Sequence, residues 1–335
     1  FTAGLEFPDP IEPARRAIAR ARSLGANAVL LAGHMGLKER TGGDDFANRV
    51  IALTGEFPGV AAFIAGHTHQ DIPSRLTNGV IFTQADHFGI HVGRLDLVFD
   101  RGSKKLLHQN ALCELMDNHI ALDATILSRT RSQLDRAAAL LAQPVGELTE
   151  NLRVKSTAGN PSNVELLIAA AITEALAEHG TTIDGVFHGL FEDKHVFKHG
   201  PKTIADIWEI LPYENYLVTG ELLPNELEIV LNEMFESRDP RSLAGFSVRV
   251  EGQGSDRRLT SLRRADGRPV DPAKRYRIAF NTFDASSAGH RFMKLRELLN
   301  RPEAHRAFHP VQTRDAVIDY FRHHKIVHPI SNGQF

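Results

Sequence analysis

Three histidines lie directly after two apolar runs that are predicted to be buried strands. His34 follows the run 28–32 in a Gly-His-Met-Gly sequence, and His67 and His69 follow the run 60–64 in a Gly-His-Thr-His sequence. Neutral imidazole is the commonest nitrogen ligand of transition metals, and neighbouring glycines let the backbone turn sharply. A single histidine in such a place is more often a hydrogen-bonded loop residue, but the repeated pattern predicts a metal site.

The elements around these histidines predict that the two loops share one edge of a sheet. Residues 44–53 between them carry apolar side chains at helical spacing, which gives a strand–helix–strand alternation. Right-handed crossovers then place both histidine loops at the same edge. A helix over 9–24 precedes this unit, and strands near 80–84 and 92–99 are predicted to complete the same layer.

The composition is that of an ordinary globular chain with room for two hydrophobic cores. The chain has 335 residues, 42% of them hydrophobic, and a formal net charge of -2. That balance does not favour nucleic acid or an anionic membrane surface as a partner, and no apolar run of about 18 residues predicts a membrane span. The single cysteine, Cys113, excludes an internal disulfide framework and a cysteine-rich metal site.

The second half of the chain alternates helices and strands of its own. An amphipathic pattern over 118–142 predicts one long helix, either linking two domains or packed wholly on the first. The Asn-Pro-Ser-Asn sequence at 160–163 is typical of a helix cap. The helices and strands predicted after it have the ranges 164–178, 184–187, 202–211, 216–219, 224–235 and 276–283, with Gly220 as a turn.

The order of these motifs resembles the 5'-nucleotidase and 2',3'-cyclic-nucleotide phosphodiesterase family. The resemblance rests on the sequences around His34, His67 and His69, on the segments 79–85 and 89–96 that follow them, and on the second half of the chain. It therefore covers nearly the whole chain.

This resemblance implies an α/β fold (α+β layered) in two domains. Residues 1–117 would be the C-terminal part of a calcineurin-like metallophosphoesterase β-sandwich flanked by helices. Residues 118–143 would be a linking helix, and 144–335 a separate α/β 5'-nucleotidase C-terminal domain that binds the substrate.

The chemistry that the resemblance implies is hydrolysis of a phosphoric ester by two divalent metal ions, Zn, Mn, Fe or Co, with a metal-bound hydroxide attacking phosphorus. His34, His67 and His69 match the family's last three protein ligands. The earlier ligands, in Asp-x-His, Gly-Asp-x-x-Asp and Gly-Asn-His-Glu motifs, do not occur in this sequence, so no catalytic residue is assigned. The chain is expected to belong to a longer protein whose N-terminal segment is the missing partner at the site, and this stretch by itself is predicted to be inactive.

In this family the C-terminal domain holds a nucleobase between two aromatic rings, and matching residues occur here. Tyr213 and Asn215 match a Pro-Phe-x-Asn motif, and Phe283 with Ala285 matches an Asn-x-Phe-x-Ala motif. Each ring taken alone is more often part of a core, but the paired motifs predict base stacking. The partner implied is a small-molecule nucleotide or a related phosphate ester.

The family's phosphate and ribose contacts are changed in this chain. The segment that supplies a phosphate-binding arginine keeps neither its glycines nor its arginine, and Lys194 is either a solvated loop lysine or a point charge in its place. Ser287-Ala288-Gly289 replaces a Gly-Gly-Asp sequence, so the carboxylate expected on the ribose hydroxyls is missing. Asp284 is near but on another face. These changes argue against ordinary AMP as the substrate.

Two classes of function stay open. One is a metal-dependent hydrolase, which by resemblance would be periplasmic or secreted; the other is a non-catalytic nucleotide or phosphate-ligand binding protein. A purely structural zinc would need a fourth ligand that the sequence does not offer.

The basic sequence 322–325 is predicted to end a helix. The other histidines considered are predicted to lie at the surface or around ligands: His87 (whose neighbour Asp86 is a candidate to orient a ligand imidazole), His91, His188, His195, His199 and His290.

Overall fold

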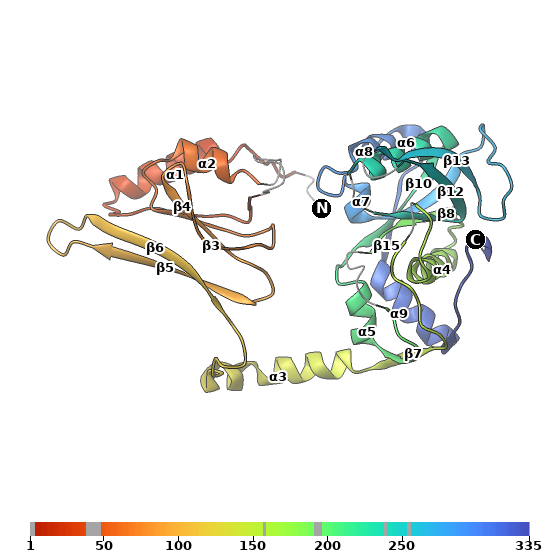
Figure 1. Ribbon diagram of the computed structural model, residues 1–335, viewed down its shortest axis with the longest axis horizontal. Coiled ribbons are helices and arrows are strands. Elements are labelled where there is room, and N and C mark those ends of the chain that lie inside the picture. The colour runs from red at the N-terminus through yellow and green to blue at the C-terminus, as the bar shows by residue number, and fades with distance from the viewer. Residues whose placement is uncertain are drawn as a thin grey trace. The chain divides into compact units, whose positions relative to one another are not determined.

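The computed structural model describes residues 4–37, 48–156, 159–190, 196–237, 240–252 and 256–334. The chain divides into two compact units, Phe1–Leu127 and Ser128–Phe335 (Figure 1). This division falls within the segment 118–143 that the sequence predicts to link two domains. Each unit combines helices with its own sheets, which confirms the predicted α/β fold class.

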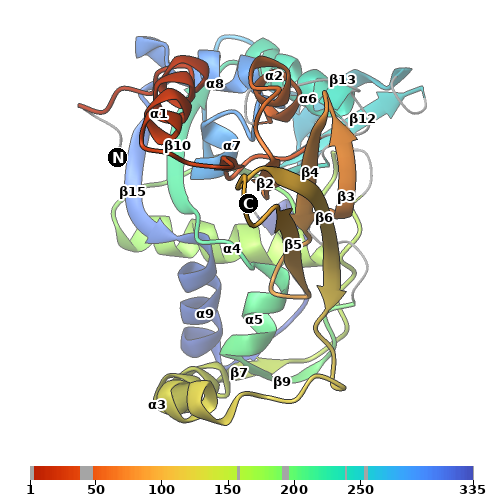
Figure 2. The ribbon, with the colours of Figure 1, turned by 90° about the vertical axis from the view of Figure 1, so that its left-hand side faces the viewer.

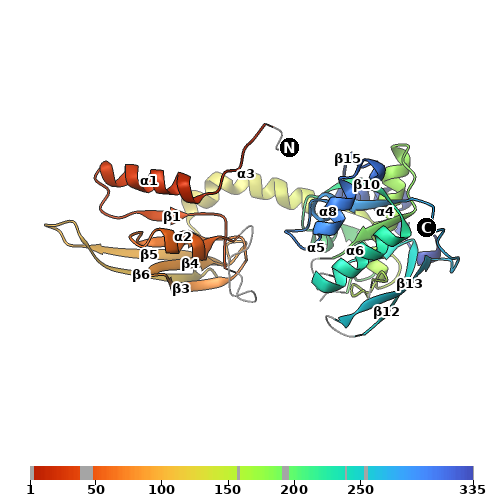
Figure 3. The same ribbon diagram turned by 90° about the horizontal axis from the view of Figure 1, so that it is seen from above.

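Unit 1 contains the alternation of strands and helices expected from its sequence. The elements are α1 Ile11–Ser23, β1 Leu30–Ala32, α2 Val50–Glu56, β2 Ala62–Ala65, β3 Asp71–Thr77 and β4 Val80–Ala85. Their sheet has the order β1-β2-β4-β3, with β1, β2 and β4 parallel and β3 antiparallel. Helices α1 and α2 lie on one side of it, and Ile18, Val50, Phe63 and Phe82 belong to the core between these layers (Figures 1 and 3).

Strand β1 is less buried than the sequence predicts. It forms the edge of the sheet, with a strand neighbour on one side only, and Leu30 is 41% exposed. In β2, which has neighbours on both sides, Ala62 and Phe63 are buried, but Ile64 is also 41% exposed, so the edge position alone does not decide the exposure. The helix predicted over 44–53 falls partly outside the described residues, and α2 covers its last part.

The prediction that a strand near 92–99 completes the first layer was wrong. This strand, β5 His91–Phe99, instead pairs with β6 Leu106–Leu115 in a separate antiparallel sheet. Both edges of β4 are already taken by β2 and β3, and β6, which the sequence analysis missed, supplies the partner. Leu95 and Ala111 of this hairpin pack with Ala62 and Ile81 of the first sheet, so that the hairpin covers part of one face of that sheet.

Helix α3 Ala124–Leu141 is shorter than the helix predicted over 118–142. Its first turn is capped by the Asp123 carboxylate, which accepts the Thr125 and Ile126 N–H groups at 2.8 and 2.9 Å. No side chain of α3 is buried. Among the described residues, no helix has the length and apolar character needed to cross a membrane.

Unit 2 is built on a mixed five-stranded sheet of order β11-β8-β14-β10-β15. These strands are β8 Gly185–His188, β10 Tyr216–Leu222, β11 Ser242–Ala244, β14 Tyr276–Asn281 and β15 Ala307–Gln312. Strand β14 is parallel to β8 and antiparallel to β10, and β15 lies beside β10 (Figure 2). Successive side chains alternate between two cores: Val186 joins one and Phe187 the other.

Helices cover both faces of this sheet. On one face lie α4 Asn163–Glu178, α5 Ile204–Ile210 and α9 Thr313–His324, and on the other α6 Pro224–Ser237 and α8 Met293–Leu299. The remaining helices are α7 Thr282–Ala285 and the 3-10 helices Pro302–Ala304 and Asn332–Gln334. A small sheet is formed by β7 Pro144–Leu148, β9 Gly200–Thr203 and β16 Ile326–Val327. Strand β12 Phe246–Glu251 pairs with β13 Arg258–Arg264.

The sequence predicted ranges for α4, β8, α5, β10, α6 and β14 of this unit, with two errors, and gave no range for its other helices and strands. The predicted cap of α4 is confirmed: the Ser162 hydroxyl accepts the Glu165 N–H, and the Glu165 carboxylate accepts the Ser162 N–H. Gly220 is not a turn, because β10 stays paired with β14 as far as Leu222. Strand β14 ends at Asn281 and not at 283, because the Asn281 side chain caps α7.

Candidate functional site

The two histidine loops of unit 1 leave neighbouring parallel strands at the same edge, as the sequence predicts. Strand pairing continues into the loops: the Gly33 N–H donates to the Ile64 carbonyl and the Gly66 N–H to the Met35 carbonyl, both at 3.0 Å. The rings of His34 and His67 consequently lie edge to face, with their centroids 5.1 Å apart.

Gly36 lets the two loops approach closely. A Cβ atom at this position would lie 2.2 Å from the Thr68 hydroxyl and 2.6 Å from the Gly66 carbonyl oxygen. The Gly36 N–H donates to the buried side-chain oxygen of Asn48 at 2.9 Å. The glycine that follows the first histidine motif is therefore required by packing between the loops.

His69 contacts a different set of side chains. Its backbone has a positive φ of 50°, and its ring stacks on His87 with centroids 4.7 Å apart. His87 is hydrogen-bonded to Asp86, and this bond lowers the pKa of the Asp86 carboxyl. The other Asp86 oxygen lies 3.5 Å from Nδ1 of His91. The His87 ring thus contacts one of the predicted ligands, and the role of the Asp86–His87 pair in orienting a ligand imidazole stays a prediction.

The described residues of unit 1 fit only part of a metal centre. His34 and His67 lie together, but within the described part of the chain the three predicted ligands do not bring three ligand atoms within 4.8 Å of one another. Three imidazoles also lack the carboxylates that two divalent ions need for charge balance and bridging. The metal assignment therefore stays a prediction.

In unit 2, the predicted base-binding residues come together at one edge of the five-stranded sheet. Strand β10 begins where its antiparallel neighbour β14 ends, with Leu217 opposite Asn281. The segment before β10 and helix α7 after β14 therefore meet, and the Thr282 hydroxyl donates to the Asn215 side-chain oxygen at 3.4 Å. Tyr213 is 45% exposed and Phe283 is half-buried. Lys194 and His195 lie outside the described residues.

A buried arginine that the sequence analysis missed holds the segment carrying Tyr213. The guanidinium of Arg314 lies 3.6 Å from the centre of the Trp208 ring and donates to the Glu214 carboxylate at 3.1 Å. The neighbouring Thr313 N–H donates to the Asn215 carbonyl at 2.9 Å. These contacts hold the backbone of the segment that carries the exposed Tyr213 side chain.

A second missed arginine holds the helix that carries Phe283. Asp284 is fully buried and accepts from Nε and Nη2 of Arg241, each at 3.0 Å. The side-chain oxygen of Asn281 accepts the Asp284 N–H at 2.8 Å. Asp284 is thus held inside the domain by Arg241 and Asn281. No local sequence signal points to Arg241.

The loop after α7 differs in sequence from the family pattern, but its backbone keeps the conformation that favours the family's glycines. Ser287 and Ala288, where the family has two glycines, adopt φ values of 97° and 46°, the region that glycine prefers. Arg291 follows them, and its guanidinium lies 5.7 Å from the centre of the Phe283 ring. The loop that lacks the family's carboxylate therefore places a cation beside the predicted stacking residue.

Two titratable groups lie buried close to this region. His188 is 4% exposed, which excludes a surface position and leaves a place around a ligand as the prediction, and burial lowers its pKa to about 3. Burial likewise raises the pKa of Glu165, in the capping box of α4, to about 7. Both groups are therefore uncharged in mildly acidic solution.

Comparisons with known proteins define the class. Residues 144–297 match the family described as 5'-nucleotidase, C-terminal domain. The solved structure of a 5'-nucleotidase precursor from Thermus thermophilus superposes with a TM-score of 0.64 at 22% identity, covering 98% of this chain and 67% of that one. This likeness shows that the chain shares the mixed α/β fold of that protein.

Curated relatives agree. The chain is 26% identical to Protein UshA of Yersinia enterocolitica, over 62% of this chain and 40% of the relative. It is 22% identical to Endonuclease YhcR of Bacillus subtilis, over 89% of this chain and 24% of the relative. The chain thus spans less than half the length of these two relatives. The resemblance read from the motifs is confirmed for the second half of the chain, where residues 144–297 match a 5'-nucleotidase C-terminal domain.

Proposed function

We propose that this chain is part of a metal-dependent phosphoric ester hydrolase that acts on a nucleotide or a related phosphate ester. Unit 2 binds the nucleobase between Tyr213 and Phe283, with Asn215 at its edge. Unit 1 supplies the imidazoles of His34, His67 and His69 to a centre of two divalent ions, Zn, Mn, Fe or Co, which would polarise the phosphoryl group and supply a hydroxide nucleophile.

The observation that carries this proposal is the meeting of the two aromatic motifs at one sheet edge. The Thr282–Asn215 hydrogen bond joins segments more than 60 residues apart, each held by a buried arginine. Such anchoring reduces the entropy lost when a base is bound between two rings. The Arg291 cation beside Phe283 supports an anionic ligand.

The first test uses the single tryptophan as a probe of nucleotide binding. Trp208 stacks on Arg314, which holds the Tyr213 segment, so a bound base should change its fluorescence. We expect titration with UMP or 2',3'-cyclic AMP to saturate, and F283L or Y213L to weaken binding about tenfold or more, because stacking contributes about 1–3 kcal/mol per base.

The matched control is F308L, which removes an exposed ring of the same unit that contacts Tyr216 and belongs to neither aromatic motif. It should bind nucleotide as the parent protein does. Equal binding by F283L, Y213L and the parent would refute base stacking at this edge.

The alternative is a non-catalytic nucleotide or phosphate-ligand binding protein. The replacement of the Gly-Gly-Asp sequence and of the phosphate-binding arginine favours it. Hydrolysis of bis(p-nitrophenyl) phosphate with Mn²⁺, Co²⁺ or Zn²⁺ separates the two candidates. We expect no turnover by the present chain alone and turnover by the longer protein that contains it; a longer protein that binds nucleotide without turnover would support the alternative.

A further inference from the structure

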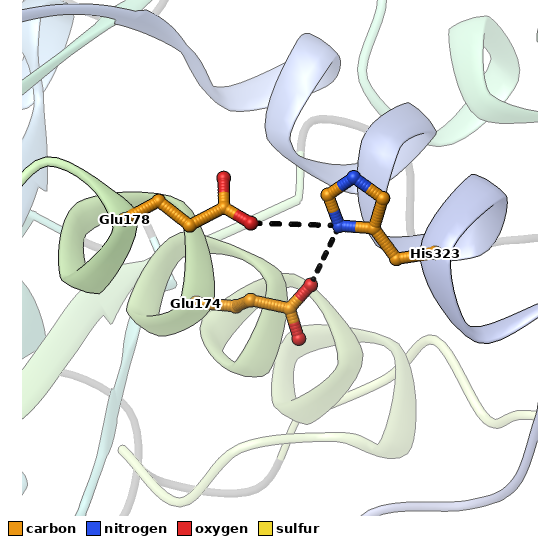
Figure 4. Close-up of side chains that lie close together, drawn as sticks. All are labelled: Glu174, Glu178 and His323. Atoms are coloured by element: carbon orange, nitrogen blue, oxygen red, sulfur yellow. Dashed lines mark hydrogen bonds and ion pairs between the residues drawn. The ribbon is translucent and has the colours of Figure 1, made fainter.

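A group of metal-binding side chains lies on unit 2, on helices that the proposed function does not use. Glu174 and Glu178 lie one turn apart on α4, and His323 lies in the last turn of α9, which packs against α4 (Figure 4). The sequence analysis explained 322–325 only as a basic helix end. The structure instead directs two imidazoles of that segment at α4 carboxylates.

The distances in this group suit a metal ion with nitrogen and oxygen ligands. Nδ1 of His323 lies 3.1 Å from a Glu174 oxygen and 3.6 Å from a Glu178 oxygen, and the three ligand atoms lie within 4.8 Å of one another. Two ligands bound at about 2.1 Å to a tetrahedral zinc are separated by about 3.4 Å. Small rotations of the two glutamates would therefore bring all three atoms into contact with one ion.

A second histidine orients the shared carboxylate. Nε2 of His324 lies 2.7 Å from the other Glu174 oxygen, and the His324 ring packs on Tyr320 with centroids 4.2 Å apart. Hydrogen bonds of this kind to a ligating carboxylate fix its direction. Glu174 and His324 also line a pocket of about 550 Å³ between α4, α9 and residues 326–330. The half-exposed His323 and Glu178 leave room for a water ligand.

We propose that Glu174, Glu178 and His323 bind one divalent transition-metal ion, with Zn²⁺ as the best match, and that this ion clamps α9 onto α4. One imidazole and two carboxylates form a ligand set that zinc accepts, and the two negative charges balance the ion. The competing occupant is a proton: an imidazolium of His323 between the two glutamates would give the same side-chain arrangement without a metal.

The experiment measures Zn²⁺ binding to the full chain at pH 7.5 by equilibrium dialysis, after removal of metal with EDTA. The parent carries His34, His67 and His69 changed to Asn, so that the histidine loops do not contribute. We expect one Zn²⁺ per chain and a rise in the melting temperature with Zn²⁺. Both E178Q and H323Q should bind Zn²⁺ about tenfold more weakly or worse and lose the rise.

The matched control is H305Q. Nδ1 of His305 lies 2.9 Å from Glu221, but that glutamate is also bound by Arg277, and the described residues do not complete a group of three ligand atoms around this pair. H305Q should leave Zn²⁺ binding unchanged. Zn²⁺ binding that E178Q and H323Q leave intact, or that H305Q weakens equally, would overturn the proposal, as would binding only at millimolar Zn²⁺. None of these results bears on base stacking by Tyr213 and Phe283.

Discussion

The loops that carry the histidines and those that carry the aromatic rings are held in different ways. In unit 1, backbone hydrogen bonds between the loops and the close approach at Gly36 set the positions of His34 and His67. In unit 2, buried guanidinium groups bind the segments that present Tyr213 and Phe283. The second arrangement holds both segments of the predicted base-binding pair within one unit, whereas the first positions only predicted metal ligands. This contrast suggests that ligand recognition can be tested in unit 2 alone.

The largest expected effect comes from breaking the buried ion pair beneath Phe283. Removing the carboxylate with D284A leaves Arg241, only 2% exposed, as an uncompensated buried charge. We expect the free energy of unfolding to fall by about 3–5 kcal/mol, and nucleotide binding to weaken as α7 loses its anchor. Urea unfolding followed by Trp208 fluorescence measures the change.

The double variant R241M/D284L is the control for that prediction. Replacing a buried ion pair by apolar residues of similar size is often neutral or stabilising, so most of the lost stability should return. A double variant as unstable as D284A would indicate that the single change acts through packing and not through the unpaired charge.

An intermediate effect is expected at the histidine loops. G36A places a methyl group 2.6 Å from the Gly66 carbonyl oxygen, which can move only if the second loop moves. We expect a loss of about 1–3 kcal/mol in urea unfolding followed by circular dichroism. The Trp208 transition should stay in place, because that residue belongs to unit 2.

G55A serves as the comparison for G36A. A Cβ atom on Gly55 would meet its nearest neighbour, an Asn78 side-chain atom, at an ordinary 3.4 Å. This change should be neutral or slightly stabilising within α2. Similar losses for both variants would mean that the approach of the two loops is not what requires Gly36.

Local signals explain which parts of this molecule could be predicted from its sequence. The strand–glycine–histidine pattern, the Ser162 cap and the two aromatic motifs each span only a few residues, so they can be recognised in the sequence. The ion pairs that anchor the segments of unit 2 join distant residues: Arg241 and Asp284 are 43 residues apart, and Arg314 and Glu214 are 100 apart. Nothing in the neighbourhood of one partner indicates the other. The pairing of β5 with β6 depended similarly on which strand edges were already occupied.

The smallest expected effect is the change in the free energy of unfolding per pH unit that Glu165, in the capping box of α4, produces. Burial raises the pKa of Glu165 from 4.5 to about 7, so between these values the folded state keeps a proton that the unfolded state releases. The stabilisation is complete below about pH 4.5 and is lost as pH rises through about 7. The resulting fall is at most about 1.4 kcal/mol per pH unit.

The measurement compares the parent with E165Q, because the buried His188 acts in the opposite direction. Its lowered pKa raises stability as pH increases from about 3 to 6.5, equally in both proteins, and so cancels from the difference. Glutamine can still accept the Ser162 N–H. Urea unfolding from about pH 5 to 8 should therefore show the parent losing stability relative to E165Q, whereas the exposed E150Q should follow the parent. If the difference in the free energy of unfolding between the parent and E165Q did not change with pH, Glu165 would not be the group that keeps a proton in the folded state.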